Sequence, residues 1–219
     1  MSNQQGVEAQ WGAAADCVVQ HMHKHVGVSK HLVRDASGGK LPITIYCIAP
    51  TSEDPCWTLF TVGMSALSMR VPSDFTGPDR AELCLRLPSD WQFTTTADGT
   101  PTFEGAGAWP LRWLRMMARL PHDMQTWLWS AHSIPNGNPA QPLAADSALC
   151  GMLIVPPLCL DEAAETITTP VGTVAMLGVV PITAAEMECK LTEGFEVLLE
   201  KLNAGGVDDV VAPSRASVV

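Results

Sequence analysis

The stretch His21-Met22-His23-Lys24-His25 carries the side chain that most often binds transition metals. On a helix, His21 and His25 lie one turn apart and share a face, so both imidazoles could reach one ion. A zinc site needs three or four ligands, and no carboxylate stands one turn away on that face. An exposed polar stripe explains the three histidines equally well, and we expect no bound metal.

The segment Gly63-Met64-Ser65-Ala66-Leu67 begins like the nucleophile elbow of a serine hydrolase. That motif needs a second glycine where Leu67 stands, because strand and helix approach each other closely there. His132 could act as a general base, but spacing assigns no Asp partner to it. A small hydrolase using Ser65 or a histidine site is therefore the alternative function. In the favoured interpretation, Ser65 ties a strand end to neighbouring backbone.

The sequence gives little support for a phosphate-binding loop or for a catalytic pair of carboxylates. Gly105-Ala106-Gly107 precedes Trp109-Pro110 instead of linking a strand to a helix, and no Lys-Ser or Lys-Thr pair follows a glycine-rich loop. The acidic residues are dispersed, so no catalytic pair can be selected by spacing. We expect no nucleotide or other cofactor, and the chain is predicted not to be an enzyme.

Length and composition favour one domain that neither crosses a membrane nor binds nucleic acid. A chain of 219 residues with 47% hydrophobic content can build one substantial core. Mean hydropathy is +0.13, but charges or prolines interrupt each apolar run before the ~18 residues of a membrane span. The start of the chain lacks a signal-peptide pattern, which predicts a cytoplasmic protein. A net charge of -10 repels phosphate backbones.

The seven cysteines are predicted to be reduced packing residues. Their number is odd, they are spread along the chain, and no C-x-x-C pair occurs among them. Most have apolar neighbours, which is typical of buried thiols in a reducing compartment.

The predicted elements that position these residues form an α+β fold, in which helices flank a mixed central sheet. Several segments are short and β-branched or continuously apolar, as expected of strands covered on both faces. The predicted strands are 43–48, 57–62, 82–87, 149–155 and 174–180. We expect a single domain over residues 1–206.

Helices are predicted at both ends and in the middle of the chain. Residues 7–26 repeat apolar side chains at helical spacing and form an amphipathic N-terminal helix. Pro110 suits a first helical position, and Pro121 is expected to stop that helix. Thr183 and Glu186 form a capping-box pattern, and residues 192–202 make the last helix. Residues 207–219 lack periodicity and are predicted to be a flexible C-terminal tail.

Seven tryptophans against one tyrosine is an unusual aromatic balance. Trp109 and Trp113 stand one helical turn apart and are predicted to pack in the core. On a strand, Trp127 and Trp129 would share one face, and that strand would run on to His132.

The order and spacing of several segments resemble a Suppressor-of-fused (SUFU-like) domain over roughly residues 30 to 203. They are Trp57-Thr58-Leu59-Phe60-Thr61-Val62-Gly63-Met64-Ser65, Glu82-Leu83-Cys84-Leu85-Arg86-Leu87-Pro88, Trp109-Pro110-Leu111, Ser130-Ala131-His132-Ser133-Ile134-Pro135, Thr169-Pro170-Val171-Gly172-Thr173-Val174, Val180-Pro181-Ile182-Thr183-Ala184-Ala185-Glu186 and Glu193-Gly194-Phe195-Glu196-Val197-Leu198-Leu199. The resemblance implies a protein-binding module. Eukaryotic members receive a partner peptide as an added strand near the equivalent of residues 130–133, which makes Trp127, Trp129 and His132 the candidate partner-binding residues.

The chain also departs from the eukaryotic pattern. Those proteins close a second, C-terminal domain over the bound peptide, and this chain is expected to lack that clamp. On an ungapped match, Trp127 stands where they carry an acidic residue. The chain is more similar to single-domain bacterial members, which are inferred to act as immunity proteins in polymorphic toxin systems. The resemblance therefore implies a bacterial immunity or regulatory protein that neutralises a toxin or sequesters a protein partner.

Overall fold

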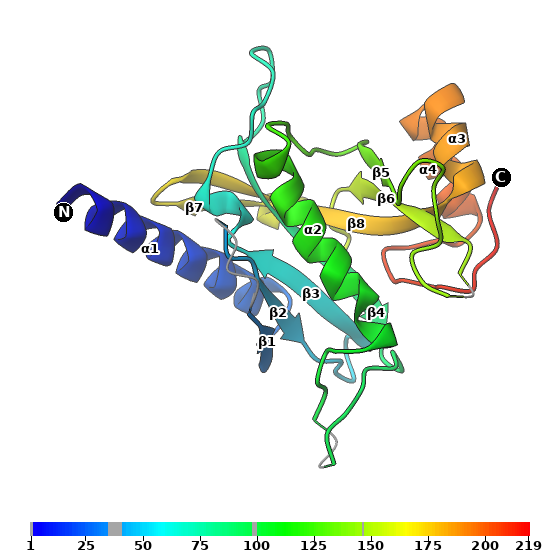
Figure 1. Ribbon diagram of the computed structural model, residues 1–219, viewed down its shortest axis with the longest axis horizontal. Helices are drawn as coiled ribbons and strands as arrows, with labels where there is room; N and C mark the ends of the chain where they lie inside the picture. The colour runs from blue at the N-terminus through cyan, green and yellow to red at the C-terminus, as the bar shows by residue number, and fades with distance from the viewer. Residues whose placement is uncertain (1, 35–40, 98–99, 146) are drawn as a thin grey trace.

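An open sheet forms the centre of the molecule in the computed structural model, which describes residues 2–34, 41–97, 100–145 and 147–219 (Figure 1). Within these residues the sheet has eight strands, in the order β1-β2-β3-β4-β8-β6-β5, with β7 paired to β8 beside this path. The strands are β1 His31–Val33, β2 Thr44–Ile48, β3 Cys56–Val62, β4 Arg80–Pro88, β5 Ser133–Pro135, β6 Leu149–Val155, β7 Thr166–Thr169 and β8 Gly172–Thr183.

The pairing of the strands makes the sheet mixed. β4 and β8 run parallel, and the other paired strands are antiparallel. Every residue of β6 is buried, and so is β8 from Val174 onward, which is why their sequences read as continuous apolar runs. The prediction of an α+β fold with a mixed sheet flanked by helices is confirmed.

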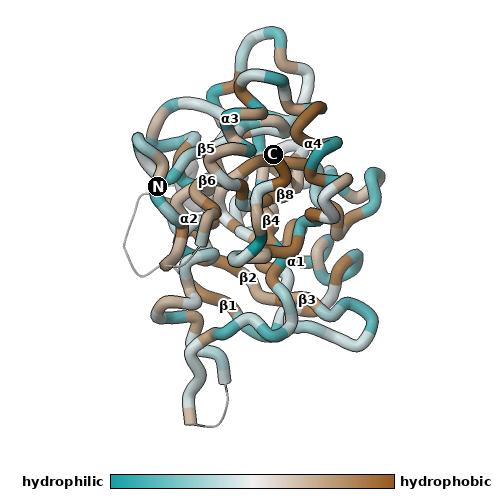
Figure 2. The backbone as a smooth tube through the Cα atoms, turned by 90° about the vertical axis from the view of Figure 1, so that its right-hand side faces the viewer, coloured by the Kyte–Doolittle hydropathy of each residue, from teal (hydrophilic) through white to brown (hydrophobic). Residues whose placement is uncertain are grey.

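Helices cover both faces of the sheet. They are α1 Ser2–His25, α2 Trp109–Asp123, α3 Ala184–Thr192 and α4 Phe195–Ala204, with short 3-10 turns η1 Met64–Ala66, η2 Ala106–Ala108 and η3 Glu162–Ala164. Along β6, Met152 and Ile154 join the core under α2, whereas Leu153 and Val155 join the core under α3 and α4. The apolar segments accordingly gather in the strands at the centre of the molecule (Figure 2).

Helix α1 agrees with the predicted N-terminal helix in type but packs over only part of its length. Ala14, Val18 and Met22 are buried at four-residue spacing, as the pattern predicted. The N-terminal half extends beyond the sheet (Figure 1), and Trp11 is 38% exposed. Trp11, one of the apolar residues within the predicted helix 7–26, therefore lies outside the core.

Helix α2 continues through the proline that was expected to stop it. Pro121 lies inside the helix, which ends at Asp123. Proline lacks an N–H, so the helix loses one hydrogen bond there. Met124 N–H still donates to the Leu120 carbonyl at 2.9 Å, and the buried Pro121 ring remains in the core. Trp109, at the start of α2, is buried as predicted.

The capping box that opens α3 is confirmed. Thr183 Oγ1 accepts from the Glu186 N–H at 3.3 Å, and Glu186 Oε2 accepts from the Thr183 N–H at 2.9 Å. The predicted last helix, 192–202, starts too early. Gly194, with φ of 104°, separates α3 from α4, so the final helix begins at Phe195.

The segment 207–219 is docked, and the prediction of a flexible tail is wrong. Val211 is buried, and its N–H donates to the Arg86 carbonyl at 2.9 Å. Arg215 forms a two-pronged ion pair with Glu186, through Nη1–Oε1 at 2.5 Å and Nη2–Oε2 at 2.6 Å. These contacts are made by single residues to distant parts of the chain, so a search for periodicity could not detect them.

Candidate partner-binding edge

The three residues singled out by the sequence lie together in an aromatic cluster. Trp127 and Trp129 both contact Phe75, with ring centroids 4.8 and 4.9 Å away, and Trp127 contacts the His132 ring at 4.6 Å. Both tryptophans are partly buried and pack against the core under α2. Phe75 thus packs against both indoles, and each indole presents only part of its surface to a partner.

The predicted strand from Trp127 to His132 is absent, because the regular strand β5 begins only at Ser133. The His132 N–H donates to the Trp129 carbonyl at 3.1 Å, which closes a turn. Ala131 in that turn has φ of 71°, a left-handed conformation that interrupts an extended chain. Ala131 N–H and His132 C=O still bond to Ile154, at 2.9 and 2.8 Å, so the turn leads directly into the sheet.

Strand β5 is the last strand of the sheet, and its outer side has no further strand in the described part of the chain. His132 C=O and Asn136 N–H both bond to β6. Backbone groups alternate along a strand, so those of Ser133 and Pro135 point away from β6. The outer side therefore offers the N–H and C=O of Ser133 and the C=O of Pro135, since proline has no N–H. These groups can pair with an added strand.

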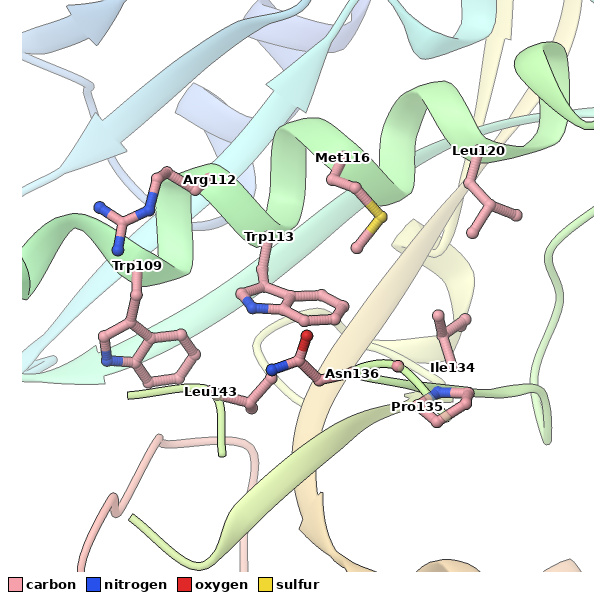
Figure 3. A pocket seen from close by; sticks show the side chains of 10 residues that line it. Trp109, Arg112, Trp113, Met116, Leu120, Ile134, Pro135, Asn136 and Leu143 are labelled. Carbon is pink, nitrogen blue, oxygen red and sulfur yellow. The ribbon is translucent and has the colours of Figure 1, made fainter. Parts of the chain in front are cut away.

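A hollow of about 480 Å³ lies on one face of β5, between it and α2. Trp113, Met116 and Leu120 point from α2 towards Ile134 and Pro135 (Figure 3). Most of the lining residues are apolar, and Arg112 and Asn136 add polar groups. Met116 is 40% exposed.

A second hollow of about 330 Å³ lies beside α3, on the other face of the sheet. Met187, Glu188 and Leu191 line it together with Pro135. Met187 belongs to the core under α3 and α4, whereas Ile134 packs on the core under α2, which places the two hollows on opposite faces. Successive side chains of a strand point to opposite faces, so a strand added to β5 would direct alternate side chains into the two hollows.

His132 is the titratable group next to this edge. Burial lowers its pKa below 6.5, the positive charge of Lys190 lowers it further, and a hydrogen bond with the Trp127 backbone opposes the shift. Such a histidine does not reduce the free energy of unfolding above its ordinary pKa. As the pH falls from that value through the folded-state pKa, the unfolded chain takes up the proton first, and the free energy of unfolding decreases.

We therefore expect His132→Gln to weaken the acid sensitivity of the fold. Urea midpoints at about pH 7.5 and about pH 5 give the loss of stability in each protein, and the loss should be smaller in the variant. His25→Gln, at an exposed position, is the matched control and should behave like the wild type. An equal acid-induced loss in His132→Gln and wild type would contradict this assignment.

Ser65 is not placed to attack a substrate. Its side chain is buried, and its hydroxyl donates to Glu82 Oε1 at 2.7 Å. Glu82 also accepts from Thr61 Oγ1 at 2.6 Å and from the N–H groups of Gly63 and Ser65 at 2.9 and 3.0 Å. Burial raises the pKa of Glu82, and these four donors oppose the rise. Ser65 is tied to this carboxyl group, instead of to neighbouring backbone alone as expected.

The remaining histidines make structural contacts. His21 Nε2 lies 2.7 Å from the Ala164 carbonyl, and the His21 and His25 rings are 4.5 Å apart. The residues that the structure describes contain no group of three or more His, Cys, Asp or Glu side chains arranged to hold a metal. None of the described helices combines the length and apolar character that a membrane span requires.

The sequence and the fold are similar to those of known proteins. The family model described as Suppressor of fused protein (SUFU) matches residues 39–216. The chain belongs to the Suppressor of fused family. No curated protein sequence matches the chain. This SUFU-family chain shares its fold with three solved structures of low sequence identity.

A putative SUFU homologue from Neisseria gonorrhoeae FA 1090 has 19% identity and a TM-score of 0.65, covering 94% of this chain and 97% of that one. The Sufu–Fu complex structure has 19% identity and a TM-score of 0.64, covering 95% and 92%. Drosophila Suppressor of Fused has 18% identity and a TM-score of 0.65, and the match covers 95% of this chain but 51% of that protein.

Sequence reasoning placed Trp109 and Trp113 in the core but did not predict the hollow that they line with Met116 and Leu120. Trp109 is buried, whereas Trp113 is only partly buried. The four residues recur at spacings of four, three and four and form an apolar stripe beside the buried residues Leu111, Leu114 and Met117. An apolar surface wider than one stripe indicates that a helix contacts something besides the core. The width of the apolar surface of α2 was therefore the sequence signal for this hollow.

Proposed function

We propose that this SUFU-family chain is a non-catalytic protein-binding module that pairs an extended segment of its partner with β5. The observation that carries the proposal is an open edge strand with a hollow on each face. Backbone pairing along such an edge provides affinity, and alternate side chains in the hollows provide specificity. The aromatic cluster of Trp127, Trp129 and His132 lies immediately before this edge and extends the partner-binding surface.

The proposed partner is a toxin or a regulatory protein, with the chain acting as a bacterial immunity or sequestering protein in the cytoplasm. Family membership and the structural similarity to a Sufu–Fu complex support protein binding in general. The net charge of -10 favours rapid encounter with a basic partner. The exposed apolar side chains of Met116 and Leu191, one at each hollow, favour a partner segment with apolar residues on both sides.

The product of the neighbouring gene is the first partner to test, by pull-down and then by binding kinetics. We expect Met116→Ala and Leu191→Ala each to weaken binding about tenfold, mainly through faster dissociation. Met124→Ala is the matched control, because Met124 is also exposed but lines neither hollow. It should bind like the wild type.

Two further variants test the aromatic cluster. Trp129→Ala and His132→Ala should raise the dissociation rate, once circular dichroism shows that each variant is folded. If both cluster variants bind more weakly while Met116→Ala and Leu191→Ala do not, the partner contacts the cluster and not the β5 hollows. Unchanged dissociation in all four variants would exclude this edge as the interface.

A further inference from the structure

Two cysteines far apart in sequence bring their thiols together beneath a loop. Cys84 lies on β4 and Cys159 lies in the connection between β6 and η3, 75 residues later. Their sulfur atoms are 4.0 Å apart. Cys84 is buried, whereas Cys159 is partly exposed.

A glycine on the neighbouring strand explains how the loop reaches Cys84. Gly178 of β8 is the register partner of Cys84. A Cβ atom at Gly178 would lie 3.0 Å from the Pro156 carbonyl oxygen and 3.1 Å from Pro157 Cα. The connection therefore lies directly on the bare backbone of β8, and Cys159 two residues later contacts the strand beside it.

The surroundings favour reaction at Cys159 rather than at Cys84. Arg86 lies two residues after Cys84 and on the same face of β4. The hydrogen bond with Cys84 lowers the pKa of Cys159, while burial and the negative charge of Asp209 oppose this. The positive charge of Arg86, which is ion-paired with Asp54 and Asp209, makes a smaller lowering contribution. Cys84, inside the core, has its pKa raised by the same hydrogen bond and by burial. A partly exposed thiol with a lowered pKa beside a second thiol has the features of an oxidation-sensitive site.

We propose that Cys84 and Cys159 form an oxidisable pair that hydrogen peroxide converts into a disulfide. The Cys159 thiolate attacks one peroxide oxygen, the O–O bond breaks, and sulfenic acid forms with release of one water after proton uptake. The Cys84 sulfur then attacks the Cys159 sulfur, forming the S–S bond and expelling the hydroxyl as a second water. Two thiols are oxidised and one peroxide is reduced. The sulfurs must close from 4.0 Å to about 2.05 Å, which requires side-chain rotation or a shift of the loop that carries Cys159.

The test uses the full chain, reduced and then treated with hydrogen peroxide. Remaining thiols are blocked with N-ethylmaleimide under denaturing conditions and counted by intact mass. We expect two fewer labels than the seven cysteines of the reduced protein, and peptide mapping should show one link between Cys84 and Cys159. Dithiothreitol should restore all seven.

Three variants make the test specific. Cys159→Ser replaces the partly exposed partner and should abolish the link, as should Cys84→Ser if that variant folds. Cys150→Ser removes another buried cysteine, in the core under α3 and α4, and should leave the link intact. The proposal is overturned if the wild type keeps all seven thiols, if Cys159 becomes sulfinic acid without a link, or if the link joins other cysteines. The proposed disulfide rests on the contact between the Cys84 and Cys159 sulfurs and not on the proposed binding function.

Discussion

Removing residues 207–219 is expected to abolish or severely weaken folding, with a loss of more than about 5 kcal/mol in the free energy of unfolding. Glu186 is fully buried, and burial raises its pKa. Hydrogen bonds from Arg215, Thr183 and the Val218 N–H outweigh that effect, and its pKa is lowered overall. Truncation removes Arg215 and Val218 together, which leaves a buried carboxylate without its charged partner.

A single substitution isolates the ion pair from the rest of the segment. Arg215→Ala should cost about 3 to 5 kcal/mol, the usual effect of removing one partner of a buried pair. Arg70→Ala is the matched control, since Arg70 is exposed, and it should change stability by about 0.5 kcal/mol or less. Urea unfolding followed by tryptophan fluorescence measures both. A truncated protein that unfolds at the wild-type midpoint would restore the interpretation of residues 207–219 as a dispensable tail.

Glu82→Ala is expected to be comparably damaging, with a loss of about 4 kcal/mol or more. It would leave three buried donors and the partly buried Gly63 N–H without this acceptor, and each unsatisfied buried donor costs about 1 to 3 kcal/mol. Glu82→Gln should cost less, about 1 to 3 kcal/mol, because an amide oxygen can keep the three hydrogen bonds made at Oε1. The ranking of the two variants therefore tests the hydrogen-bond arrangement itself.

Glu53→Gln, at an exposed position, is the matched control for removing one negative charge. It should unfold at the wild-type urea concentration. If Glu82→Ala lies within about 1 kcal/mol of the wild type, the four donors find other acceptors and this site does not hold β3, η1 and β4 together.

Elements whose apolar residues follow a regular period could be predicted from the sequence. The longer strands β2, β3, β4, β6 and β8 and the helix α2 were found within a few residues of their observed bounds, because their burial pattern is continuous or periodic. The capping box at Thr183 and Glu186 was found because it depends on local spacing alone.

The candidate edge could be predicted only in part. Strand β5 has three residues, too few to show an alternation, and the left-handed Ala131 ended the expected strand at a position that no residue type signalled. Each hollow is lined by residues from elements that only the tertiary fold brings together. The docked segment 207–219 escaped detection for the same reason, since its contacts are isolated and long-range.

The missing N–H of Pro135 weakens pairing between β5 and the same strand of another copy of the protein. An open sheet edge can recruit the same edge of another molecule, and repeated recruitment leads to aggregates. If the β5 strands of two copies paired, each strand would contribute a proline that has no N–H to donate to the other. We expect the edge to accept a single foreign segment whose side chains fill the hollows, while open-ended growth of the sheet stops at its first step.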